Sequence, residues 1–219
     1  SVFLDKKEIF PLGVLLVSGG HTLVLDISAN GKISVLAKTG DDSFGESFDK
    51  VAKMLGLDYP GGALIENLAK NCDGNLNFTI PLLHDKRLEY SFSGLKNQVR
   101  MEIEKAGETS QSVQENIAAS FQKTAIAHIM DKLSKIYEMK KWQNFAVVGG
   151  ASANLVLRTK LENLANKYGS TLHLAPLKFC SDNAAMIARA GVYKYNKKEF
   201  MNYKNLDIVP HLNYENFKI

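Results

Sequence analysis

The chain has 219 residues, of which 45% are hydrophobic and 23% charged, with a formal net charge of +4. This composition is typical of a soluble globular protein of one large or two small domains, and the mild positive charge permits an acidic partner without predicting one. Cys72 and Cys180 lie far apart without CxxC spacing, which predicts free thiols in a reducing compartment. No apolar run approaches the ~18 residues of a membrane span and no signal peptide is present, so we expect a cytoplasmic protein and no membrane partner.

The first third of the chain predicts strands joined by tight turns. Apolar runs at 13–18 and 22–27 flank a turn with two glycines, and Asn30-Gly31 joins the second run to a third at 33–38. A helix is expected at 44–55, because its apolar side chains recur on one helical face.

The rest of the chain predicts mainly helices. A buried-strand run at 145–148 ends in two glycines, and another strand is expected at 171–175. Ser93 is expected to cap a short helix. The five expected helices are 63–70, 94–104, 112–137, 153–167 and 181–195. Antiparallel strands, long helices and a strand–Gly-Gly–helix unit together predict an α/β layer fold with a ligand crevice at the strand ends.

The turn Ser18-Gly19-Gly20-His21 is a candidate anion site. Glycines allow a ligand to approach the backbone and can adopt positive φ, so that successive N–H groups face one anion. Ser18, His21 and Thr22 add side-chain donors at the same tip. The alternative, which this segment alone favours, is an ordinary hairpin whose serine and histidine point into solvent.

A second pair of glycines, Gly149 and Gly150, stands where a buried strand passes into a helix. This turn suits the close approach of a flat base, or a helix N-terminus that faces an anion. The alternative is a tight strand-to-helix turn in which Ser152 caps the helix.

Asp49 and Glu66 are candidate ligands for ribose hydroxyls, because a carboxylate accepts two hydrogen bonds. Asp49 is alternatively a solvated surface residue beside Lys50 and Lys53. Glu66 alternatively forms a surface ion pair with Lys70, four residues further along the helix.

Asp182 stands at the start of the last predicted helix, where an aspartate serves more often as a helix cap than as a metal ligand. No HExxH or HxxxH motif is present to complete a metal site. His128 lies on the long helix, so we expect it to serve packing or to lie at the surface.

Basic residues surround the compact polar turn at 91–96. They form either a patch for phosphates or an ordinary solvated face, and the second is usual for such runs. The residues are Lys86, Arg87, Lys96 and Arg100.

Five segments of the chain closely resemble one family in their order and spacing. They are LLVSGGHT (15–22), FGESFDKVAKMLGLDYPGG (44–62), SFSGLK (91–96), VVGGASAN (147–154) and FCSDNAAMIARAG (179–191). The family is TsaD/Kae/Gcp, the tRNA threonylcarbamoyladenosine transferases, in its bacterial form. The resemblance runs from about Leu12 to Tyr195, and five motifs in the family's order argue against a chance match.

The resemblance implies an actin-like ATPase fold of the ASKHA, RNase H-like class, with a β-hairpin phosphate loop and a helical insertion at about 44–140. It implies an actin-like domain at 12–195, a leftover linker at 1–11 and a C-terminal tail at 196–219. The implied activity transfers a threonylcarbamoyl group from threonylcarbamoyl-adenylate to the exocyclic amine of the tRNA adenosine 3′ of the anticodon.

The family pattern also implies a set of site residues. Residues of the hairpin would meet the phosphate and carbamoyl end of the adenylate: Leu16, Val17, Ser18, Gly19 and Gly20. Asp49 and Glu66 would hold the ribose, and Gly62 would approach the nucleoside. Asn154 would face the adenine, and Asp182 would be a ligand of one divalent catalytic metal ion, iron or zinc.

Family members run longer at the N-terminus, where a His-x-x-x-His motif supplies the other metal ligands, and this chain starts after that motif. We therefore expect the chain alone neither to hold the metal tightly nor to catalyse transfer. The implied partners are tRNA, a paralogous TsaB-like subunit and a TsaE-like ATPase, with ATP as a related nucleotide ligand. Two other functions remain open: an actin-like ATPase or kinase, and a non-catalytic scaffold subunit.

Overall fold

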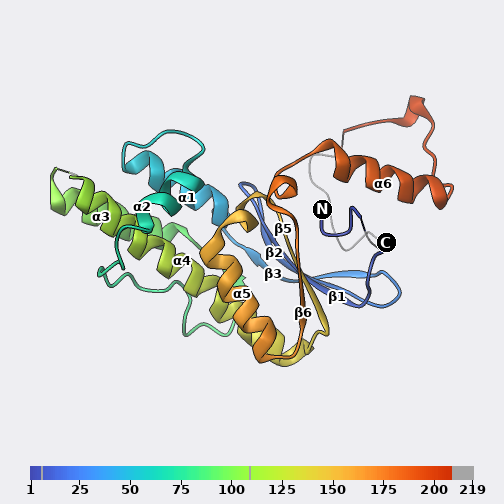
Figure 1. The fold of residues 1–219 in the computed structure, drawn as a ribbon, viewed down its shortest axis with the longest axis horizontal. Helices are drawn as coiled ribbons and strands as arrows, with labels where there is room; N and C mark the ends of the chain where they lie inside the picture. The colour runs from blue at the N-terminus through green and yellow to red at the C-terminus, as the bar shows by residue number, and fades with distance from the viewer. Residues whose placement is uncertain (6, 109, 209–219) are drawn as a thin grey trace.

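The computed structural model describes residues 1–5, 7–108 and 110–208, which build a mixed sheet with helices packed along it (Figure 1). The six strands lie in the order β4-β3-β2-β1-β5-β6. Their bounds are β1 Leu12–Val17, β2 Thr22–Ile27, β3 Ile33–Thr39, β4 Glu89–Tyr90, β5 Asn144–Val148 and β6 Thr171–Leu174. The first three strands are antiparallel neighbours, β5 and β6 run parallel to β1, and β4 runs parallel to β3.

Both predicted hairpins are present. β1 and β2 pair up to Val17 and Thr22, so that residues 18–21 form the turn between them. In the second hairpin Gly31 adopts a φ of 79°, which glycine takes without steric cost. Because β1, β5 and β6 are parallel, the segments that follow them leave the same edge of the sheet.

Six helices connect and cover the strands. Their bounds are α1 Phe44–Met54, α2 Gly61–Ala69, α3 Ser93–Ala106, α4 Gln111–Lys140, α5 Leu155–Lys167 and α6 Ala184–Asn196. Short 3₁₀ turns lie at Gly150–Ala153, Leu177–Phe179 and Tyr203–Asn205. Figure 1 shows α1–α3 at one end of the molecule, with α6 and the N-terminus at the other.

The starts of five helices differ from their predicted positions. α2 and α4 begin two residues and one residue early, and the other three helices also differ in their caps. Ser93 is the first residue of α3 and does not cap it. α5 is capped by Asn154 and not by Ser152, because the Asn154 side chain accepts from the Leu157 amide. α6 begins after Asn183, whose side chain accepts from the Met186 amide, so the predicted start at residue 181 is wrong.

The main core lies between the sheet and the helices. Phe48 of α1 meets Phe121 of α4 edge-on, with ring centroids 4.9 Å apart, and both side chains are buried. On the other face of the sheet Val2 packs with Leu12 and Cys180. The segment expected as a linker, residues 1–11, thus contributes to this second cluster.

No helix in the described ranges is long and apolar enough to cross a membrane. Of the expected tail at 196–219, residues 209–219 lie outside the described residues. The part that is described contains the short 3₁₀ turn at Tyr203–Asn205.

Candidate functional site

A cavity of about 550 Å³ lies where the β1–β2 turn meets α1, α2, the turn after β5 and the segment before α6. A hollow of this size at the carboxyl ends of parallel strands is typical of a small-molecule site. Most of the sequence-predicted site residues line it: Ser18, Gly19, Asp49, Gly62, Glu66, Asn154 and Asp182. The structure therefore brings together residues from five separate segments of the chain.

Three of the predicted site residues do not line this cavity. Val17 is fully buried in the main core, and Leu16 packs with the cluster on the opposite face of the sheet. Gly20 is exposed on the turn. Of the hairpin residues expected to contact a ligand, only Ser18 and Gly19 line the cavity.

The hairpin tip differs from its expected conformation, because neither Gly19 nor Gly20 has positive φ. The amides of Gly20 and His21 donate to Ser18 Oγ at 3.2 and 3.0 Å, so the side chain itself closes the turn. The Gly19 amide makes no hydrogen bond with the described residues. Since Ser18 Oγ accepts both amides, its own hydrogen is left to donate elsewhere. The tip thus offers the Gly19 amide and the Ser18 hydroxyl, and not a row of successive amides.

The N-terminus of α1 anchors this tip. The Gly45 amide donates to the Ser18 carbonyl oxygen at 3.1 Å, and the Phe44 amide donates to Thr22 Oγ1 at 2.7 Å. A Cβ at Gly45 would lie 2.6 Å from the Ser18 carbonyl oxygen, so this contact requires glycine. Because these first amides of α1 already have acceptors, the helix positions the tip and is not itself an open anion site.

Asp49 lies on α1 and its carboxylate reaches α2. Asp49 Oδ1 accepts a hydrogen bond from the Gly61 amide at 2.8 Å. This bond caps α2, because the N-cap residue Pro60 provides no side-chain hydrogen bond. The solvated alternative beside neighbouring lysines is therefore wrong. Gly62 and Ala63 follow in α2, and their amides have no acceptor within the described residues. This helix N-terminus faces the cavity with two free donors.

Glu66 also joins two elements. Its Oε1 accepts from the amide of Leu155, the first residue of α5, at 2.8 Å. Negative charge at a helix N-terminus is stabilised by the helix dipole. The expected alternative, an ion pair with Lys70, is wrong, because Lys70 Nζ bonds Asn67 Oδ1 at 2.9 Å instead.

Asn154 is fixed from two sides. Its Oδ1 accepts from the Leu157 amide at 2.9 Å, and its Nδ2 donates to Gln122 Oε1 at 2.8 Å. The preceding Gly149 has a φ of 96° and packs the turn after β5 against the end of β1. Only one Nδ2 hydrogen of Asn154 remains for a ligand.

Asp182 is exposed at the edge of the cavity, on the segment between β6 and α6. It forms no hydrogen bond or ion pair with the described residues, and Asn183 takes the capping role instead. Within residues 1–5, 7–108 and 110–208, no group of three His, Cys, Asp or Glu side chains is placed to hold a metal ion.

Tyr59 lines the cavity and was not singled out from the sequence. The residue is 84% exposed and directly precedes Pro60, the N-cap of α2. An exposed aromatic ring beside a cavity offers a stacking surface for a flat base. The signal in the sequence is an aromatic residue directly before Pro60-Gly61-Gly62.

The segment Ser91–Lys96 docks onto the loop before α1. Asp41 accepts from the Ser91 hydroxyl at 2.6 Å and from the Phe92 amide at 2.8 Å. Burial opposes ionisation of Asp41, but these bonds and those from Ser93 outweigh it and lower its pKa. Lys96 forms an ion pair with Asp42. The carboxylate of Asp41 thus does the capping that was expected of Ser93.

The basic residues around this segment do not form an open phosphate patch. Lys96 is paired with Asp42, Arg87 pairs with Asp85 at 2.6 Å, and Arg100 pairs with Glu104 at 3.0 Å. The solvated-face alternative is correct for the two arginines, and Lys86 is likewise exposed.

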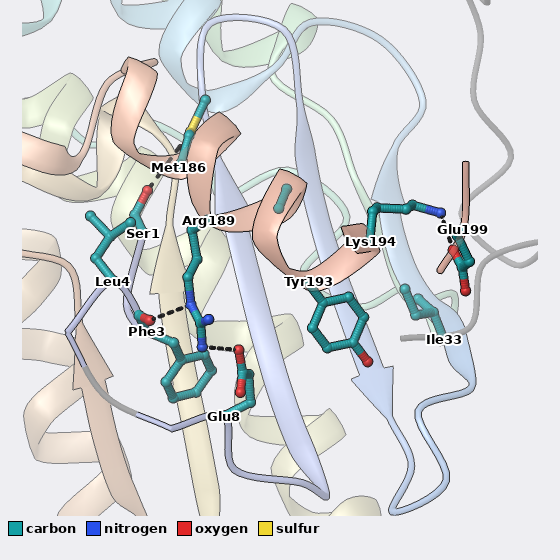
Figure 2. Close-up of a pocket in the computed structure, with 11 residues that line it drawn as sticks. Ser1, Phe3, Leu4, Glu8, Ile33, Met186, Arg189, Tyr193, Lys194 and Glu199 are labelled. Atoms are coloured by element: carbon teal, nitrogen blue, oxygen red, sulfur yellow. Dashed lines mark hydrogen bonds and ion pairs between the residues drawn. The ribbon is translucent and has the colours of Figure 1, made fainter. Parts of the chain in front are cut away.

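A second hollow, of about 360 Å³, lies between the N-terminal segment and α6 (Figure 2). Arg189 crosses it, donating to the Phe3 carbonyl oxygen at 3.3 Å and pairing with Glu8. Most of its lining is apolar, and none of the predicted site residues belongs to it.

The chain has the actin-like, ASKHA-type fold, which it shares with two solved structures that it matches. One is full-length HypF in a phosphate- and nucleotide-bound form (TM-score 0.63, 15% identity, 84% of this chain and 39% of that chain). The other is the activator of 2-hydroxyisocaproyl-CoA dehydratase from Clostridium difficile with bound ADPNP (TM-score 0.50, 16% identity, 89% of this chain and 65% of that chain). The predicted fold class is confirmed.

The family model described as TsaD, tRNA N6-adenosine threonylcarbamoyltransferase, matches residues 1–189. Relatives with that curated name include proteins from Campylobacter hominis (98% identical over the whole chain), Campylobacter fetus (62% over 96% of it) and Campylobacter concisus (58% over the whole chain). This chain belongs to the TsaD family. It spans 66%, 63% and 66% of the lengths of these relatives.

Proposed function

We propose that this chain supplies the adenylate-binding part of a tRNA N6-adenosine threonylcarbamoyltransferase. The observation that carries the proposal is the single cavity that gathers the hairpin tip, two carboxylates, a helix N-terminus, Asn154 and Asp182. Its volume of about 550 Å³ falls in the range of pockets for small ligands. The curated name of the relatives supports the transferase over an ATPase, a kinase or a scaffold subunit.

The cavity suggests how threonylcarbamoyl-adenylate would lie. Asp49 and Glu66 each have one carboxylate oxygen fixed on a helix and one without a partner among the described residues, which suits two ribose hydroxyls. The ring of Tyr59 and the turn before Asn154 would flank the adenine. The free amide of Gly19 and the hydroxyl of Ser18 would meet the anionic carbamoyl–phosphate linkage.

The transfer requires attack by the exocyclic amine of adenosine on the carbamoyl carbon, with release of AMP. The new C–N bond replaces the C–O bond to phosphate, and the amine loses a proton. Donors at the tip would stabilise charge on the departing phosphate. The reaction requires no covalent nucleophile, and no Ser–His or Cys–His pair lines the cavity within the described residues, so we propose direct attack without a covalent enzyme intermediate.

The residues present fit part of a divalent metal site. Asp182 offers a carboxylate with no partner in the described part of the chain, at the edge of the same cavity. Iron or zinc, when bound, would act as a Lewis acid on the transferred carbonyl group. Because a catalytic site of this kind normally has about three protein ligands, we propose that Asp182 is one ligand and that the others come from outside the described residues.

The wider assignments rest on family membership. We propose tRNA as the acceptor, with a TsaB-like paralogue and a TsaE-like ATPase as partners in the cytoplasm. We also propose residues 12–195 as the actin-like unit, with the helical insertion at about 44–140.

Nucleoside analysis of tRNA tests the proposed function. In cells depleted of the full-length protein, the wild-type gene should restore threonylcarbamoyladenosine. An Asp182→Ala variant should restore at least about a hundredfold less, because a group that stabilises the transition state is lost. Asp73→Ala is the matched control, since Asp73 lies outside the cavity, and it should restore the wild-type level. Full restoration by Asp182→Ala would contradict the role given to this carboxylate.

A further inference from the structure

Ser43 contacts the backbone carbonyl oxygens of the hairpin tip. Its Oγ donates to the Gly19 carbonyl oxygen at 2.7 Å and lies 3.1 Å from the Ser18 carbonyl oxygen. The side chain also accepts from the Glu46 amide at 3.1 Å, and the residue is only 1% exposed. Ser43 therefore does more than cap α1, because a cap needs only the bond to Glu46.

These bonds set the direction of the amide that the proposed function uses. The C=O and N–H groups of a trans peptide point in opposite directions. The Ser18 carbonyl and the Gly19 amide belong to one peptide group. Holding that carbonyl against Ser43 and Gly45 therefore turns the Gly19 amide away from α1, where the described residues provide no acceptor.

We propose that Ser43 is a positioning residue for the anionic linkage of the nucleotide ligand. It acts through Gly19 and Ser18, and it does not touch the ligand itself. This inference rests on the proposed function, since it assumes that the phosphate end lies at the tip.

The Ser91–Lys96 segment binds the two residues that precede Ser43. Ser43 directly follows Asp41 and Asp42, which are held by Ser91, Phe92 and Lys96. Asp42 is held further by Lys50 at 2.6 Å. This motif lies outside the cavity, and in our proposal its role is to keep the loop that carries Ser43 in place.

Titration with two ligands tests the proposal, because ATP has a phosphate chain and adenosine has none. Ser43→Ala should bind ATP about tenfold more weakly, the effect of one misdirected donor to a charged group. Its Kd for adenosine should stay within about twofold of wild type. Lys96→Met should show the same selective effect to a smaller degree. Isothermal titration calorimetry measures both constants.

Glu46→Ala is the matched control for the capping role. It removes the other half of the capping box on α1, in which Glu46 Oε2 accepts from the Ser43 amide, and leaves the bonds from Ser43 to the tip. Its affinities for ATP and adenosine should both stay near wild type. If Ser43→Ala does not fold, Ser43→Cys replaces it, since a thiol is a weak donor of similar size.

Two outcomes overturn the proposal in different ways. Equal losses of ATP and adenosine affinity in the Ser43 variants would show a purely structural role and would leave the proposed function intact. Failure of the wild-type protein to bind either ligand would overturn the proposed function and this inference with it.

Discussion

Replacement of Gly149 by alanine will destabilise the folded chain by about 3 kcal/mol or more. Gly149 has a φ of 96° and a ψ of 159°, a region that is essentially restricted to glycine. A Cβ at this position would lie 2.2 Å from the carbonyl oxygen of Val17. That oxygen belongs to the backbone of β1, so it cannot move aside as the end of a flexible side chain does. Urea unfolding followed by circular dichroism measures the loss.

The neighbouring glycine provides the matched control. Gly150 does not have positive φ, and a Cβ there would meet no heavy atom within 4 Å. Gly150→Ala should therefore change the free energy of unfolding by no more than about 0.5 kcal/mol. Similar stability of the two variants would show that the backbone at Gly149 is not constrained as described.

The second large effect is a loss of stability on acidification, caused by His128. This side chain is fully buried and packs edge-on against Tyr90 and Phe92, and its Nε2 accepts from the Ser91 amide at 3.1 Å. Burial, which is the larger cause, and the nearby charge of Lys132 together lower the pKa of His128 to about 4. Asp131 and Asp41 act in the opposite direction but do not offset these two causes.

The sign follows from proton linkage. Between pH 6.5 and about 4 the unfolded chain binds a proton at His128 that the folded chain does not bind. The contribution to stability is complete above pH 6.5 and is lost as the pH falls through this window, by about 3 kcal/mol in total. His128→Gln keeps an acceptor for the Ser91 amide but cannot titrate. Its free energy of unfolding should depend on pH much less over this range.

Urea titrations at several pH values between 4 and 7.5 give the comparison. His84→Gln is the matched control, because it removes a histidine that is exposed to solvent. This variant should retain the slope of the wild-type chain. A slope in His128→Gln equal to that of wild type would mean that another group causes the acid sensitivity.

The local patterns of the sequence predicted most of the fold. Alternation and turn glycines located the first three strands, and the apolar repeat of α4 located the helix that fills the core. β4 was not predicted, because two residues are too few to show a period. The ends of α3, α5 and α6 were misplaced by one to three residues, since several polar residues near each end can serve as the cap.

The site was harder to predict, because its geometry depends on contacts between distant segments. The residue types at the cavity could be read from the motifs. The motifs did not show that Ser18 closes its own turn, or that Asp49 bonds Gly61 on the next helix. Sequence patterns identify caps a few residues away, whereas Glu66 meets Leu155 across 89 positions of the chain.

The hydrogen bonds that fix the Asp49 and Glu66 carboxylates on helix amides affect the entropy of ligand binding. A carboxylate on a free surface loses rotamer freedom when a ligand captures it, at a cost of about 0.5–1.5 kcal/mol for each side chain. Here each group has already been immobilised during folding, with one oxygen bonded to a helix amide. A ribose that binds the second carboxylate oxygens of Asp49 and Glu66 therefore meets two acceptors that are already oriented. Its binding should cost less conformational entropy than binding to two carboxylates that are free to rotate.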